Sequence, residues 1–221
     1  MRGSPTNSVD VVLCTPHGRQ LAVLLVQNES KRARERWSLP WAPVAEKDAL
    51  DHTAARVALR AAGARATWLA QAGAFADAER HPGGAGLSVA YLGVTPLRVH
   101  APPDGAQWFP AGKLPPLAPR HRSIVAAARA QLRERLDRAP IAFRLLGATF
   151  TLSDLQAIYE LLLGRRLHKA SFRRSLQAAF LVEPTDEWRS EGRGRPAQLF
   201  RYAPRRRRGG RGGVRFELLG G

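Results

Sequence analysis

The sequence of 221 residues contains one cysteine, Cys14, and only four lysines among its 35 basic residues. A single cysteine excludes an intrachain disulfide and a metal cluster built on cysteine thiolates. The sequence also has no apolar run long enough to cross a bilayer and no signal peptide. These absences favour a cytoplasmic protein without a membrane partner.

Acidic residues are scarce as well. The chain has 18 Asp and Glu against 35 Lys and Arg, a formal net charge of +17. From Pro140 onward there are 16 basic and 7 acidic residues, a balance of 16 − 7 = +9 in the shorter part of the chain. The electrostatic field of this excess positive charge attracts polyanions and raises their rate of association. A membrane surface would attract it too, but no strongly amphipathic anchor is present. The balance therefore favours a nucleic acid as partner.

Two amphipathic helices are predicted in the C-terminal part. Thr151 is a suitable N-cap, Asp154 follows at capping-box spacing, and Gly164 ends the first helix. The second helix begins near Lys169. Its predicted buried face consists of Phe172, Leu176, Ala179 and Phe180. Its other face carries small and basic residues, which suit close approach to a DNA major groove.

A basic hairpin follows the second helix. The segment 185–197 lies between two apolar runs, 180–182 and 199–202, that can pair as strands. Helix, turn, basic helix and basic hairpin in this order predict a winged helix-turn-helix that binds double-stranded DNA. A helical subdomain with a solvated basic surface is the alternative. The residues predicted to contact DNA are Thr151, His168, Lys169, Ser171, Arg173, Arg174, Arg193 and Arg195.

Thr151 and the C-terminal tail each have two competing explanations. Capping alone accounts for Thr151, although a helix N-terminus also suits a phosphate. Residues 205–221 form an arginine- and glycine-rich tail, which is either a disordered solubilising end or a source of non-specific phosphate contacts.

The N-terminal half predicts strands around a central helix. Gly63 ends that helix, and residues 107–109 form a short strand or a turn. The helix 120–136 is expected to bridge two domains. The predicted elements are a hairpin of Val9–Cys14 and Gln20–Gln27, a helix over Ala49–Ala62, and strands over Trp68–Phe75 and Leu87–Val94.

This half resembles a Nudix domain, through the Trp37-Ser38-Leu39-Pro40 segment, the alanine-rich helix and Val89-Ala90-Tyr91-Leu92. The Nudix box has a glycine, a glutamate six residues on, then Arg-Glu-x-x-Glu-Glu-x-Gly. The corresponding residues here are Ala42, Asp48, Arg56, Val57, Arg60, Ala61 and Gly63. Nudix hydrolysis depends on divalent cations, which need carboxylate oxygens. With the three helix glutamates missing, we expect no catalytic residues, no metal site, no cofactor and no hydrolase activity.

Arginine side chains can bind phosphate directly, without a divalent cation. Arg36, Arg56 and Arg60 are the residues predicted to bind an effector, with a solvated surface as the alternative. The histidines at positions 17, 52, 81, 100 and 121 are scattered without metal-ligand spacing.

The chain from about residue 9 to 203 resembles the Nudix-related transcriptional regulators of the NrtR family. The resemblance rests on Leu114-Pro115-Pro116-Leu117 with His121, on Phe150-Thr151-Leu152, and on Gly194-Arg195-Pro196-Ala197. It implies an α+β fold, in which an N-terminal Nudix-like α/β/α sandwich with a mixed sheet precedes a C-terminal winged helix-turn-helix. It also implies a homodimeric repressor that responds to an ADP-ribose-like nucleotide sugar and controls genes of NAD or sugar metabolism. Where the family commonly has an acidic residue before His121, this chain has Arg120.

The predicted domains are a sensor at 1–118, a bridging helix at 119–139, a DNA-binding domain at 140–204 and the tail at 205–221. Two other functions remain open from the sequence. One is a Nudix-type pyrophosphohydrolase with a relocated metal site, and the other is a nucleic-acid-binding protein without an effector.

Overall fold

The computed structural model describes residues 6–18, 20–28, 34–45, 47–96, 101–136, 139–190 and 196–203. The chain divides into two compact units, Met1–Gln131 and Leu132–Gly221. The division falls inside helix α2 (Pro119–Arg135), which therefore contributes to both units. The sequence predicted this helix as a separate bridging segment. None of the helices in the described ranges is long and apolar enough to cross a bilayer.

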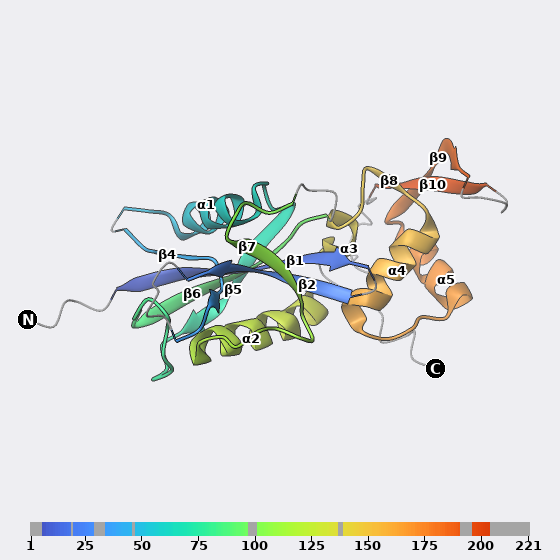
Figure 1. Ribbon diagram of the computed structural model, residues 1–221. Helices are drawn as coiled ribbons and strands as arrows, with labels where there is room; N and C mark the ends of the chain where they lie inside the picture. The colour runs from blue at the N-terminus through green and yellow to red at the C-terminus, as the bar shows by residue number, and fades with distance from the viewer. Residues whose placement is uncertain are drawn as a thin grey trace, which may run out of the picture. The chain divides into compact units, whose positions relative to one another are not determined.

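A seven-stranded mixed sheet forms the first unit (Figure 1). The strand order is β3-β2-β1-β6-β5, with β4 beside β1 and β7 beside β2. Only the β1–β6 pair is parallel among the pairs of described strands. The predicted hairpin and the two predicted later strands are confirmed. The bounds are β1 Asn7–His17, β2 Gln20–Gln27, β3 Trp37–Ser38, β4 Trp41–Pro43, β5 Trp68–Phe75, β6 Leu87–Val94 and β7 Ala106–Pro110.

Helices cover both faces of this sheet. In Figure 1, α1 (Leu50–Ala62) and α2 lie on opposite sides of it. Alternate residues of β1, namely Val9, Val11 and Leu13, pack with the buried face of α1. The helix ends where predicted, because Gly63 takes the left-handed conformation at φ 71°. The α/β/α sandwich expected for a Nudix-like domain is thereby confirmed.

The second unit is a winged helix. Its three-stranded sheet has the order β8-β10-β9. Phe143 lies at the centre of the aromatic core, 4.4 Å from Tyr202, 5.9 Å from Phe150 and 6.4 Å from Tyr159 between ring centroids. The sequence did not predict α3 or β8. The elements are α3 Ile141–Arg144, β8 Thr149–Phe150, α4 Leu152–Leu163, α5 Lys169–Ala179, β9 Val182–Arg189 and β10 Ala197–Tyr202.

Phe180 does not lie on the buried face of the second helix, as the sequence had predicted. The helix α5 ends at Ala179, and Phe180 takes the left-handed conformation at φ 51°. Its side chain is 47% exposed. Since the chain leaves the helix at this residue, the helical spacing that predicted burial no longer applies. The following strand accordingly begins at Val182.

Candidate nucleic-acid interface and sensor domain

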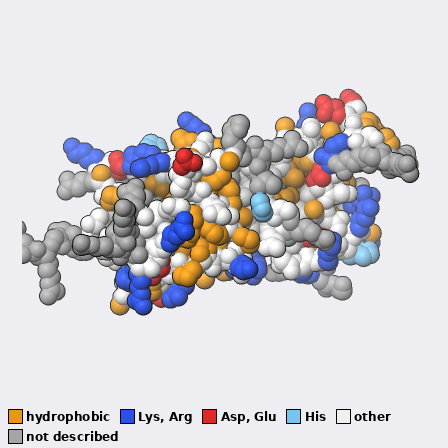
Figure 2. All heavy atoms as spheres, viewed as in Figure 1, with side chains coloured by type: hydrophobic (Ala, Val, Ile, Leu, Met, Phe, Trp, Pro, Cys, Tyr) orange, Lys and Arg blue, Asp and Glu red, His pale blue; other side chains and the backbone are white. Residues whose placement is uncertain are grey.

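Helix α5 presents a basic face to solvent. Phe172 and Leu176 are its buried residues. Lys169, Arg173 and Arg174, predicted to contact DNA, are all exposed. Figure 2 shows basic side chains gathered over this helix. The apolar stripe thus holds α5 against the core and leaves cationic side chains free to approach a polyanion.

The first residues of α5 are also accessible. His168 is the N-cap residue and is exposed. Its Nδ1 lies 3.2 Å from the hydroxyl of Ser171, which is half-buried. Both residues were predicted to contact DNA, and they lie together where the N-terminus of a recognition helix meets base edges in such motifs.

Two side chains of α4 hold the turn that leads into α5. Glu160 Oε1 accepts hydrogen bonds from the backbone N–H of Leu167 at 2.9 Å and from Gln156 at 3.0 Å. Gln156 also donates to the carbonyl of Leu167 at 3.0 Å, and Arg166 pairs with Glu160 at 3.2 Å. Burial alone would raise the pKa of Glu160, but these hydrogen bonds and Arg166 lower it. A charged Glu160 therefore fixes the start of α5.

Thr151 forms the predicted capping box. Its hydroxyl accepts from the N–H of Asp154 at 3.0 Å, and the Asp154 carboxylate accepts from the N–H of Thr151 at 2.9 Å. The residue is only 4% exposed. The capping role is confirmed. The phosphate contact stays a prediction, which this burial disfavours.

The tip of the wing, with Arg193 and Arg195, lies outside the described residues, as does the tail 205–221. Arg189, the last residue of β9, is described, and its Nη2 lies 2.7 and 2.9 Å from the two carboxylate oxygens of Asp154. No role was predicted for this arginine from the sequence.

In the first unit, the Nudix-box positions that fall on α1 lie on both its buried and its exposed face. Val57 and Ala61 are buried in the core, whereas Arg60 is exposed. Asp48 accepts hydrogen bonds from Arg56 at 2.9 Å and from Thr53 at 3.2 Å. The hydrogen bond from Arg56 is the main reason that the pKa of Asp48 is lowered. One carboxylate already paired with an arginine does not fit the oxygen-rich shell of a divalent cation.

The three arginines predicted to bind an effector are all exposed. Arg56 and Arg60 lie one turn apart on α1. Arg36 lies just before β3, and its guanidinium carbon is 5.7 Å from the centre of the Trp37 ring. Their chemistry suits phosphate, and the assignment stays a prediction.

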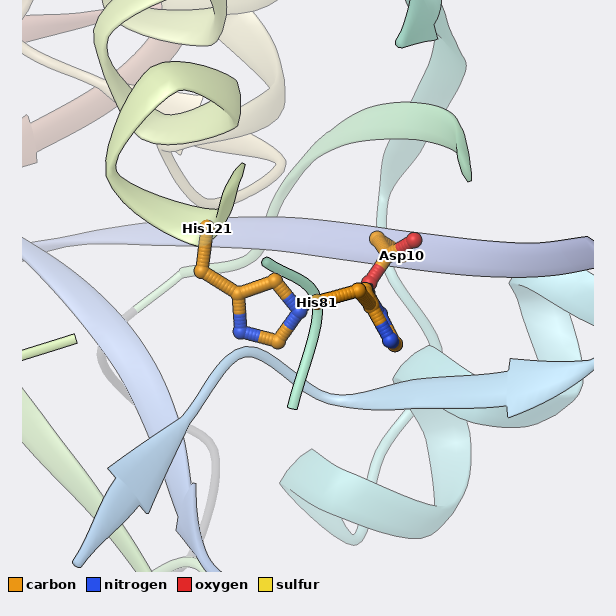
Figure 3. A group of neighbouring side chains, drawn as sticks. All are labelled: Asp10, His81 and His121. Carbon is orange, nitrogen blue, oxygen red and sulfur yellow. Dashed lines mark hydrogen bonds and ion pairs between the residues drawn. The ribbon is translucent and has the colours of Figure 1, made fainter. Parts of the chain in front are cut away.

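A buried cluster that the sequence did not predict lies beneath the sheet. Asp10 of β1, His81 and His121 of α2 converge from distant parts of the chain (Figure 3). Both imidazole Nε2 atoms lie 2.9 Å from the same oxygen of Asp10. All three side chains are completely buried. The sequence predicted no metal-ligand spacing among the histidines and gave no sign that His81 and His121 meet at Asp10 in the fold.

The hydrogen bonds assign the protons in this cluster. The backbone N–H of Leu39 donates to Nδ1 of His121 at 3.1 Å, and that of Gly83 donates to Nδ1 of His81 at 3.0 Å. Each Nδ1 is therefore an acceptor, so each Nε2 carries the hydrogen and donates to Asp10. A histidine that binds a metal through Nε2 needs hydrogen on Nδ1 instead, facing an acceptor. The group suits a hydrogen-bonded cluster and does not suit a metal ion.

Charge in the cluster follows from the same contacts. Burial would raise the pKa of Asp10, but the hydrogen bonds from His121 and His81 outweigh it and hold the pKa well below its ordinary value. Burial also lowers the pKa of His121. The cluster is thus a carboxylate that accepts a hydrogen bond from each imidazole. The second oxygen of Asp10 accepts from Ser8 at 2.7 Å.

Arg120, the departure from the family pattern, is buried beside this cluster at 2% exposed. Its guanidinium donates to the carbonyl oxygens of Ala85, Gly86 and Asp77. It also lies 3.3 Å from the Asp77 carboxylate. Arg120 therefore fastens the first turn of α2 to the loop between β5 and β6.

Comparisons with known proteins agree with this two-part architecture. The NrtR DNA-binding winged helix domain matches residues 142–202. An Acinetobacter baylyi protein described as "ADPR responsive transcriptional repressor NtrR" is 30% identical over 209 residues, covering 90% of this chain and 83% of the relative.

Solved structures resemble most of the chain. The crystal structure of Shewanella oneidensis NrtR complexed with a 27mer DNA has a TM-score of 0.78 and 29% identity, and covers 89% of this chain and 93% of that one. A MutT/nudix family protein from Enterococcus faecalis has a TM-score of 0.71 over 92% of this chain and 88% of its own; at 19% identity it shows the fold alone. A winged helix that matches the NrtR domain, a Nudix-like sandwich in the same chain and this relatedness over nearly the full length place the protein in the NrtR family of transcriptional regulators.

Proposed function

We propose that the protein is a transcriptional repressor that binds duplex operator DNA through α5 and the wing. The observation that carries this proposal is the exposed cationic face of α5, formed by Lys169, Arg173 and Arg174 on a helix whose other face is buried. The Shewanella relative is described in complex with a 27mer DNA. Arginine and lysine read guanine edges and phosphates, and the small Ala170 and Ser171 permit close approach.

The Nudix-like domain is proposed to sense ADP-ribose or a closely similar nucleotide sugar. The Acinetobacter relative is described as responsive to ADPR. In this chain, Arg36, Arg56 and Arg60 are exposed cations available to a pyrophosphate. The effector would act by favouring a conformation with lower affinity for the operator.

This domain is further proposed to bind the effector without cleaving it. At the box positions, Val57 and Ala61 are buried apolar residues, and Asp48 is paired with Arg56. No divalent cation could be held by these residues in the way that Nudix hydrolysis needs.

A direct experiment starts from the full-length protein and a duplex selected by it from a random-sequence library. Specific binding is expected at a stated salt concentration, and ADP-ribose is expected to release the duplex. Arg174→Ala should weaken specific binding by roughly 1–3 kcal/mol if the arginine makes a bidentate base contact. Failure to enrich any sequence above random DNA would refute the proposed function.

The pyrophosphohydrolase alternative needs a relocated metal site. Among the described residues, Asp10, His81 and His121 form a group of suitable residue types. Their complete burial keeps them from a substrate, and their proton arrangement opposes a metal. Steady release of AMP from ADP-ribose with Mg²⁺ or Mn²⁺ would favour the enzyme. Calorimetry with no heat from ADP-ribose would favour a regulator without this effector.

A further inference from the structure

Side chains of α4 contact both the wing and the turn before the recognition helix. Gln156 and Glu160 hold the turn before α5. Asp154, in the first turn of α4, bonds Arg189 of the wing strand β9. The first group of contacts fixes the position of the recognition helix α5. The contact between Asp154 and Arg189 fixes the position of the hairpin.

Arg189 is the last residue of strand β9, at the end of the hairpin strands that leads into the tip of the wing. It pairs with Ala197 as the outermost register pair of the β9–β10 hairpin, next to the connection that carries the predicted Arg193 and Arg195. Its Nη2 reaches both oxygens of Asp154, and about two-thirds of each side chain is buried. Because Asp154 also caps Thr151, the ion pair joins the wing to the capping box of α4.

The surroundings of Arg189 argue against a direct contact with phosphate. Asp186 and Glu187, on the same strand, are exposed. Figure 2 shows acidic side chains over the wing, where they would repel a DNA backbone. The guanidinium itself is already bonded within the protein. A charge-assisted bond of this kind is strong and directional.

We propose that Arg189 is a positioning residue for DNA binding, which acts through Asp154 to fix the direction of the wing and does not itself touch the operator. The proposal rests on the proposed function, because it concerns how the same winged helix meets DNA. It gives Arg189 a role that differs from the direct DNA contact predicted for Arg193 and Arg195.

The test uses the full-length protein and the selected duplex described above. Arg189→Gln breaks the ion pair. Asp154→Asn also breaks it but keeps the arginine and leaves an amide oxygen able to accept from Thr151. Arg201→Gln is the matched control, since Arg201 pairs with Glu183 at 3.2 Å within the same hairpin and its loss changes the charge equally.

Arg189→Gln and Asp154→Asn are each expected to weaken operator binding by about tenfold, and the double variant by little more than either alone, because both remove one shared contact. Arg201→Gln should change binding by less than about threefold. Hydroxyl-radical footprints should lose protection at the flanks reached by the wing, in both variants, while the central protection from α5 persists. Circular dichroism and unfolding curves verify that every variant is folded, and Arg189→Lys, which keeps the charge, should recover part of the affinity.

Additive losses would overturn the proposal, as would an Asp154→Asn protein that binds as tightly as the unchanged protein while Arg189→Gln binds weakly. The latter result would make Arg189 a direct DNA contact. If the unchanged protein has no preference for the selected duplex, the proposed function fails; if it is selective and both variants match it, only the positioning role fails.

Discussion

The hydroxyl of Thr151 serves the protein's own backbone, so its main contribution should be to stability. Replacing Thr151 with alanine removes an N-cap and should lower the free energy of unfolding by about 1 kcal/mol, whereas serine should retain most of it. Urea unfolding of the three proteins gives this comparison. Operator binding by the alanine variant, measured where it is fully folded, should stay near the original value. A large loss of operator affinity in the folded alanine variant would instead support the predicted contact between Thr151 and a phosphate.

His121 should make stability depend on pH in mild acid. Burial lowers its pKa below the ordinary 6.5, so the folded protein favours the neutral imidazole. The unfolded chain then takes up the proton first, and stability falls as the pH drops below about 6.5. His121→Gln, which cannot titrate, should flatten the decline in unfolding free energy between pH 7 and pH 5. An unchanged slope would contradict this assignment.

The lowered pKa of Asp10 has the same sign but acts at lower pH. Its contribution is present above the ordinary value of 3.8 and is lost only as the pH falls below it. Measurements at pH 7, 6 and 5 therefore separate the effect of His121 from that of Asp10. This separation makes the two groups of one cluster distinguishable.

This cluster also marks the limit of prediction from single residues. Asp10 is separated from His81 by 71 positions and from His121 by 111. No periodicity links residues so far apart, and only the packing of α2 beneath the sheet brings them together. Thr151, Gly63 and Gly164 were predictable, because caps depend on a few neighbouring residues.

Among the elements, those with a strong local pattern were predicted closely. Strands β5 and β6 have the predicted bounds, and α4 has its predicted cap and stop. The four-residue α3 and the two-residue β8 have no period of their own and form through tertiary contacts, as in the pairing of Phe150 with Phe200. The exposure of Phe180 was missed because the helix was assumed to include this residue, whereas it ends at Ala179.

The buried face of α1 predicts the result of restoring the Nudix glutamates. Val57→Glu would place a carboxylate among apolar side chains and should lower the free energy of unfolding by roughly 3 kcal/mol or more. Ala55→Glu, on the exposed face of the same helix, is the control and should be nearly neutral. Denaturant unfolding measures both. A stable Val57→Glu protein that releases AMP from ADP-ribose would show that this domain can still hold a metal.

At the scale of the whole molecule, we predict a homodimer that places two α5 helices on one duplex. A single recognition helix reads few base pairs, and dimeric helix-turn-helix proteins meet half-sites about one helical turn apart. Sedimentation of the free protein and titration of the selected duplex should give two protomers per duplex. A single protomer per duplex at saturation would count against the dimer.

The ion pair of Asp154 and the hydrogen bonds of Glu160 restrict how α4 can change in evolution. Asp154 and Glu160 lie less than two turns apart. Inserting one residue between them would rotate one relative to the other by about 100° and shift it by about 1.5 Å. The ion pair to Arg189 and the bonds to the turn before α5 could not then form together. Related chains should therefore tolerate length variation in the tip of the hairpin, and keep the spacing between these two carboxylates invariant.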